Sequence, residues 1–120
     1  MTDAATTVTA EDIGDNLRRI MVNGRLDSIG IDEVAAELLA LAEAPKNVVV
    51  DLTGVPFLAS AGIGQLIATA QAVKARGGFM VLLAAPSSSV KMSLDMVGIA
   101  PMIPVFDNPS TAYTSAMRGF

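Results

Sequence analysis

Ser60 is the side chain of this sequence that is best placed to undergo chemistry. It stands between Ala59 and Ala61 in the segment Phe57 to Gly64, which reads FLASAGIG. Small neighbours make a serine hydroxyl accessible, and a phosphate on it would meet the unpaired N–H groups and positive dipole end of the helix predicted to start there. The alternative is an N-cap serine whose oxygen accepts a backbone N–H. The residue type by itself favours the cap, whereas the small neighbours favour modification.

Most other catalytic and metal chemistry lacks the residues it needs. The 120-residue sequence contains no cysteine and no histidine. Thiol nucleophiles, thiolate metal sites and the commonest general base are therefore absent. Asp51 follows an apolar run, where receiver domains carry a phosphoacceptor aspartate, but the lysine such a site needs near the last strand is missing. We interpret Asp51 as structural, bonded to nearby backbone.

Two further patterns have plain interpretations. Gly62-Ile63-Gly64 is not a dinucleotide fingerprint, because Ile67 stands where the third glycine is required. The acidic residues Asp27, Asp32 and Glu33 are interpreted as a solvated helix start, not as a metal site. We therefore predict a protein that is not an enzyme and that binds no cofactor and no metal.

Composition narrows the class of partner. The net charge is −4, aromatic residues make up 4%, and the basic residues are scattered, which argues against nucleic acid. The length of 120 residues predicts one globular domain over residues 1–120. The hydrophobic fraction of 52% argues against disorder and leaves apolar surface for a partner protein or a homodimer. No apolar run reaches the roughly 18 residues of a membrane span, and the first residues do not form a signal peptide. We expect a cytoplasmic protein without membrane insertion.

The elements that hold Ser60 follow from apolar periodicity. The run Val48 to Leu52 is typical of a strand buried on both faces. After a loop over 53–59, an apolar stripe predicts a helix from about Ser60 to Arg76, ended by Gly77. That stripe consists of Ile63, Leu66, Ile67, Ala70 and Val73. The opposite stripe is small and flat, and is either a solvent face or a docking face for a partner that also contacts Ser60. It consists of Ala61, Gln65, Ala68, Ala72 and Ala75.

The remaining patterns complete a regular alternation of strands and helices. Strands are predicted at 6–10, 17–23, 48–52, 79–83 and 103–106, the last at an edge because of Pro104. A helix is predicted from about residue 29 to Pro45, with Asp32 and Glu33 in its first turn, and others at 60–76 and 109–118. A shorter helix is predicted to run to Val97 after the loop 86–89, with one of the loop's serines as its cap. The short turn at 14–16 favours an antiparallel first pair. The order predicts an α/β fold with a mixed, mostly parallel sheet of about five strands and about four helices.

Four segments together resemble the STAS domain family (sulfate transporter and anti-sigma factor antagonist) in its stand-alone bacterial form. They are Gly24-Arg25-Leu26-Asp27, the run Val48 to Val55, the run Phe57 to Gly64, and Ala75-Arg76-Gly77-Gly78. The resemblance covers nearly the whole chain and implies a single STAS domain over residues 1–120. The family's strongest form of the central loop is Asp-Ser-Ser-Gly, whereas this chain has Ala59-Ser60-Ala61-Gly62.

The resemblance also implies a function. Such proteins bind an anti-sigma factor that is also a serine kinase, and phosphorylation of the serine matching Ser60 abolishes that binding. The residues it places at the partner surface are Gly24, Leu26, Asp27, Ala59, Ser60, Ala61, Gly62, Gly64, Gln65 and Ala68. The alternative is an unphosphorylated STAS subunit of a stress-sensing complex or a lipid transporter. An enzyme of flavodoxin-like type is a third hypothesis.

Overall fold

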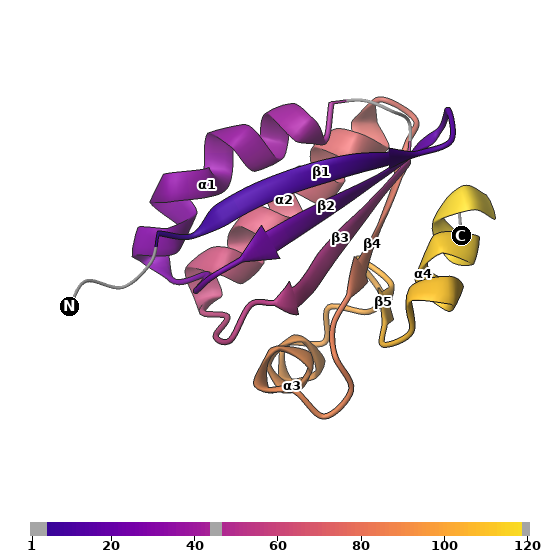
Figure 1. The fold of residues 1–120 in the computed structure, drawn as a ribbon. Coiled ribbons are helices and arrows are strands. Elements are labelled where there is room, and N and C mark those ends of the chain that lie inside the picture. The colour runs from indigo at the N-terminus through magenta and orange to yellow at the C-terminus, as the bar shows by residue number, and fades with distance from the viewer. Residues whose placement is uncertain (1–4, 44–46, 119–120) are drawn as a thin grey trace.

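The computed structural model describes residues 5–43 and 47–118, which form a five-stranded sheet with helices on both faces (Figure 1). The elements are β1 (Thr7–Ile13), β2 (Leu17–Asn23), α1 (Ser28–Leu41), β3 (Asn47–Gly54), α2 (Ser60–Ala75), β4 (Phe79–Leu83), α3 (Ser89–Met96), β5 (Val105–Phe106) and α4 (Pro109–Arg118). Their order and types confirm the predicted alternation.

The strands lie in the sheet in sequence order, from β1 to β5. The short turn between β1 and β2 makes that pair antiparallel, whereas the helical connections make the other three pairs parallel. The central strand is in register with both neighbours, since Val50 lies opposite Ile20 of β2 and Leu82 of β4. The predicted mixed, mostly parallel sheet is therefore confirmed.

β3 is buried on both faces, as its continuous apolar run predicts. Val48, Val50 and Leu52 belong to the larger core, which the sheet shares with α1 and α2. Val49 faces the other way, into a smaller core with Ala112 of α4. The carboxyl end of β3 is thereby held between two packed layers, and α2 begins just after it (Figure 1).

Several boundaries differ from the predictions. β3 runs from Asn47 to Gly54, so it extends into the segment predicted as a loop. β1 continues to Ile13 because Glu11 and Asp12 lie opposite the arginines of β2, which balances their charge. β5 contains two residues, since Pro104 before it has no N–H for the ladder, although its carbonyl accepts from Leu82. The helix expected from about residue 29 begins at Ser28, with no acidic residue in its first turn.

The ends of the helices show how local sequence sets the boundaries. Asp27 caps α1 by accepting from the N–H of Gly30, and Ser88 caps α3 by accepting from Lys91. The cap of α3 by one of its serines was predicted, and it is confirmed. α2 ends at Ala75, and Gly77, two residues further on, has a φ of +84°, the left-handed conformation that glycine tolerates. The predicted end of α1 at Pro45 lies outside the described residues.

Candidate functional site

Ser60 is the first residue of α2 and is exposed at the carboxyl edge of the sheet. The N-cap is Ala59, with an extended backbone (φ −98°, ψ 172°) and no side-chain oxygen to offer the helix. The interpretation of Ser60 as the cap is therefore wrong. Within residues 5–43 and 47–118, the Ser60 hydroxyl makes no hydrogen bond.

The position of Ala59 explains why the helix begins at Ser60, one residue earlier than a cap by Ser60 would require. The N–H of Ala59 donates to the carbonyl of Leu26 at 3.0 Å, and the N–H of Leu26 donates to the carbonyl of Phe57 at 2.9 Å. These bonds form a short parallel bridge between Leu26 and Leu58, whose side chains are both buried. The loop after β2 and the loop after β3 are thus joined as one unit, and Ala59 is held extended.

Gly62 is required inside this unit. A Cβ atom on it would lie 2.5 Å from the Leu26 carbonyl oxygen and 2.7 Å from Cδ1 of Leu58. Leu26 and Gly62 were both predicted at the partner surface, but both are buried. They pack against each other inside the protein and hold the two loops together, so they are not part of the exposed surface. Gly64 is exposed, and a Cβ atom there would meet nothing within 4 Å.

The outward side chains of the two joined loops meet beside the site, where Arg25 contacts both Asp27 and Phe57. The Arg25 guanidinium carbon lies 5.4 Å from the centroid of the Phe57 ring, and its Nη2 lies 3.1 Å from Oδ2 of Asp27. The hydrogen bond from Gly30 and the charge of Arg25 keep the pKa of Asp27 below its ordinary value. Arg25 and Phe57 were not predicted as site residues. The sequence pattern that could have indicated Arg25 is its place next to the buried Leu26, because neighbouring side chains of an extended segment point to opposite sides.

The small-residue stripe of α2 starts beside Ser60 and is exposed, as both of its interpretations, a solvent face and a docking face, require. Ala61 and Ala68 are exposed, and Gln65 is half-buried with its side-chain nitrogen 3.3 Å from Oγ1 of Thr69. Thr69 is turned inward and donates to the Gln65 carbonyl. The stripe is therefore a flat surface with a single polar side chain near Ser60.

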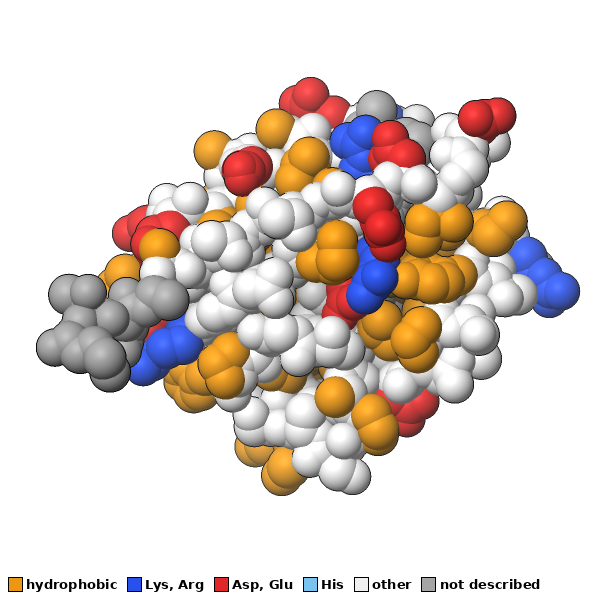
Figure 2. All heavy atoms as spheres, in the orientation of Figure 1, with side chains coloured by type: hydrophobic (Ala, Val, Ile, Leu, Met, Phe, Trp, Pro, Cys, Tyr) orange, Lys and Arg blue, Asp and Glu red, His pale blue; other side chains and the backbone are white. Residues whose placement is uncertain are grey.

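α3 adjoins the same site. Oγ of Ser89, at its first turn, donates to the carbonyl of Pro56 in the loop after β3, at 3.1 Å. Met92 and Met96 lie three and seven residues further on the same helix face, and are 60% and 84% exposed. Figure 2 shows hydrophobic side chains at the lower end of the molecule, where α3 lies in Figure 1.

Asp51 is a structural residue, as predicted. Its side chain is 3% exposed, accepts from the N–H and hydroxyl of Thr53, and pairs with Arg19 at 2.5 Å. Burial raises the pKa of Asp51, but the bonds from Thr53 and Arg19 outweigh burial and hold the pKa below its ordinary value. Figure 2 shows oppositely charged side chains adjoining one another on this face of the sheet. Arg19 was not predicted as the partner.

Replacing Asp51 by Asn is expected to lower the free energy of unfolding by about 1–3 kcal/mol, because the partly buried Arg19 then loses its buried carboxylate and keeps only the exposed pair with Glu11. Because folding lowers the pKa, the stabilisation is complete above the unfolded pKa of about 3.9 and is lost as the pH falls through the lower folded pKa. Urea denaturation at pH 7 and at acidic pH measures both effects. Asp12→Asn, at an exposed ion pair with Arg18, is the control and should change stability little.

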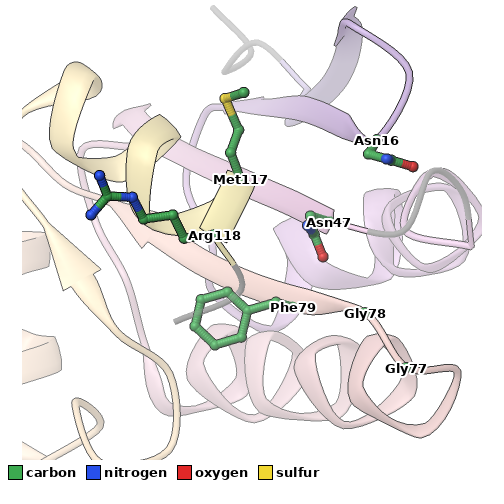
Figure 3. A pocket seen from close by; sticks show the side chains of 7 residues that line it. All are labelled: Asn16, Asn47, Gly77, Gly78, Phe79, Met117 and Arg118. Carbon is green, nitrogen blue, oxygen red and sulfur yellow. The ribbon is translucent and has the colours of Figure 1, made fainter.

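A hollow at the opposite end of the sheet is unrelated to Ser60. It has a volume of about 370 Å³ and is lined by Asn16, Asn47, Gly77, Gly78, Phe79, Met117 and Arg118. Figure 3 shows that the guanidinium of Arg118 points away from Asn16 and Asn47. No carboxylate lines it. The lining offers amides and an aromatic ring but no set of groups for acid–base or nucleophilic chemistry.

The described part of the chain contains no group of three His, Cys, Asp or Glu side chains arranged to hold a metal ion. None of the helices described here has the length and apolarity to cross a membrane.

The sequence as a whole matches the model of one protein family. The match to the STAS domain spans residues 7–112, from β1 into α4. The chain belongs to the STAS domain family. The resemblance carried by the four segments is thus confirmed. No curated protein is similar enough in sequence to match.

Solved structures agree with this STAS fold. An anti-sigma factor antagonist from Mycobacterium paratuberculosis has a TM-score of 0.82 and 24% identity, over 94% of this chain and 95% of that one. The phosphorylated form of SpoIIAA, a Bacillus cell fate determinant, has a TM-score of 0.65 and 18% identity, over 90% and 97%. A sulfate transporter family protein from Wolinella succinogenes has a TM-score of 0.68 and 20% identity, over 90% of each chain. At these identities the likeness concerns the fold.

Proposed function

We propose that this STAS protein is an anti-sigma factor antagonist that binds an anti-sigma factor with serine kinase activity and is released by phosphorylation at Ser60. The observation that carries the proposal is the exposed Ser60 hydroxyl, which has no role in capping α2 and stands beside two loops joined by hydrogen bonds. A hydroxyl without a structural task is open to a kinase. The protein is then a substrate and a switch, not an enzyme, and it needs no cofactor of its own.

The exposed residues around Ser60 form the proposed contact surface. Asp27 lies on the adjoining loop, and Ala59 is half-buried beside the serine. The surface continues along α2 through Ala61, Gly64, Gln65 and Ala68. Gly24, Leu26 and Gly62 hold the loops in place beneath it. A surface with few long side chains lets a partner approach the Ser60 backbone closely.

Phosphorylation would act on this surface through charge. A phosphate adds a charge of about −1.5 to −2 and three acceptor oxygens. The N–H groups in the first turn of α2 can hold that anion on the free protein, since the dipole of the helix favours negative charge there. A closely packed partner surface would have to desolvate the phosphate, which opposes binding.

The structural comparisons support this choice among the known uses of the STAS fold. One similar structure is that of an anti-sigma factor antagonist, and another is that of SpoIIAA in a phosphorylated form. Both likenesses extend over most of this chain. The partner, the kinase activity and the modified residue of this protein remain part of the proposal.

Incubation with ATP, Mg²⁺ and an anti-sigma factor kinase from the same cells tests the switch. The expected result is one added phosphate per chain, located on Ser60 by peptide mass spectrometry, and none on the Ser60→Ala variant. An unmodified Ser60 in the presence of a kinase that is active on another substrate would contradict the proposal.

The alternative is an unphosphorylated subunit of a stress-sensing complex or a lipid transporter. It is favoured by Ala59 and Ala61, which replace the polar neighbours of the family's strongest loop, and by the flat stripe of α2. A similar structure is that of a sulfate transporter family protein. Affinity purification from the native cells separates the two functions: recovery of a transporter ATPase supports the subunit, and recovery of a kinase-like anti-sigma factor supports the switch.

A further inference from the structure

We propose that Arg25, stacked on Phe57, selects the partner of this site, and that the partner presents a carboxylate flanked by apolar side chains. This inference rests on the proposed function, since it concerns the same contact surface around Ser60. Arg25 and Phe57 are here named the Arg–Phe platform. Their side chains are 57% and 46% exposed, respectively. Aromatic residues and arginine are both enriched in the buried cores of protein interfaces.

The platform is held in place before any partner arrives. The hydroxyl of Thr6 donates to the Arg25 carbonyl at 2.7 Å, and the Phe57 carbonyl accepts from Leu26. The ring of Phe57 lies under the guanidinium at a distance that gives a cation–π contact. The backbone that carries the platform is therefore already ordered before a partner binds.

The charge of the platform is only partly balanced within the chain. Asp27 contacts Nη2 of Arg25 through Oδ2, while its other oxygen caps α1 at Gly30. A guanidinium has five N–H donors, so one carboxylate oxygen leaves donors for a second acceptor. A carboxylate is the acceptor that fits this planar fork best. The partner group opposite Arg25 is therefore an Asp or Glu side chain.

Apolar surface extends from the platform onto α3. Pro56, which precedes Phe57, is bonded to Ser89 of α3, and Met92 and Met96 follow on the face that starts at Ser89. Exposed methionines are flexible and polarizable, and they adapt to irregular apolar partners. The partner is thus expected to surround its carboxylate with aliphatic or aromatic side chains.

A second copy of this chain fits the platform poorly. In a symmetric dimer through this face, the carboxylate that the patch of the other copy offers to Arg25 is that of Asp27. That carboxylate already contacts its own Arg25 and caps α1 at Gly30. The occupant chosen here is therefore a different protein, and self-association through the platform is one of the outcomes that would overturn the proposal.

The test is a titration of the partner that the wild-type chain retains from native cells, expressed and purified separately. Arg25→Glu should weaken its binding roughly 10- to 100-fold, and Phe57→Ala and Met92→Glu roughly 10-fold. Matched controls at exposed positions away from Ser60 are Lys74→Glu for charge and Met117→Glu for the apolar surface. Circular dichroism confirms that each variant is folded.

The outcomes separate this inference from the proposed function. Unchanged binding by Arg25→Glu, with binding lost in Ser60→Asp, overturns the Arg–Phe platform and leaves the switch. Loss in Arg25→Glu with no effect of Ser60→Asp supports the platform and overturns the switch. Equal losses in Arg25→Glu and Lys74→Glu indicate a general charge effect and overturn the platform, as does concentration-dependent dimerisation that Arg25→Glu changes.

Discussion

Replacing Ser60 by Asp is expected to lower the affinity for the anti-sigma factor roughly 10- to 100-fold, because a charge is buried at the contact without a partner. Ser60→Ala should bind as the wild type does, since the hydroxyl makes no hydrogen bond within the described residues and does not cap α2. The two substitutions therefore differ in charge at one exposed position. Isothermal titration with the purified anti-sigma factor measures both affinities.

The control for a general effect of charge is Ser110→Asp. Ser110 is also exposed in the first turn of a helix. That helix is α4, which packs in the smaller core, whereas α2 packs in the larger core on the other face of the sheet. The substitution thus places the same negative charge at the start of a helix that is not part of the proposed contact surface. Unchanged binding by Ser110→Asp with reduced binding by Ser60→Asp supports the switch. Equal affinities of Ser60→Asp and Ser60→Ala would refute the charge mechanism.

Replacing Gly62 by Ala is expected to destabilise the protein by about 1–3 kcal/mol, because the new methyl group overlaps the Leu26 carbonyl. The obstacle is backbone at 2.5 Å, which moves only if the two joined loops separate. Gly64→Ala is the matched control in the same helix, since the space around Gly64 is open. Alanine there should stabilise α2 by up to about 1 kcal/mol through helix propensity.

Urea denaturation of the two variants measures the difference in their free energies of unfolding. Hydrogen exchange adds a local measurement, since the N–H of Ala59 is protected by the Leu26 carbonyl. Gly62→Ala should speed exchange at Ala59, and Gly64→Ala should not. Equal stabilities for Gly62→Ala and Gly64→Ala would mean that the packing of Gly62 against Leu26 does not hold the site together.

The elements of the fold could be predicted because they depend on local patterns. The apolar run Val48 to Leu52 predicted a strand covered on both faces, and the structure buries it between α1 and α2 on one side and α4 on the other. Short turns and apolar stripes predicted the strand pairing and the helix faces. The absence of histidine and cysteine already excluded most catalytic chemistry before any contact was known.

The roles of individual site residues depended on contacts between distant segments. Asp51 was predicted as structural from what surrounds it in sequence, but its ion pair joins it to Arg19, 32 residues away. The pairing of β2 with β3 places those two side chains on one sheet face. Nothing in the local sequence of either residue indicates which charge it meets.

Ser60 shows where sequence and tertiary structure divide. The sequence by itself determined that a serine would stand at the start of a helix after a buried strand, in small-residue surroundings. Only the tertiary structure decided that this serine is not the cap, because Leu26 holds Ala59 in the extended conformation across 33 residues of chain. It also decided that Gly62 serves the interior and that Arg25 stacks on Phe57. Local propensity sets elements, whereas hydrogen bonds and close packing between separate loops set what each residue can touch.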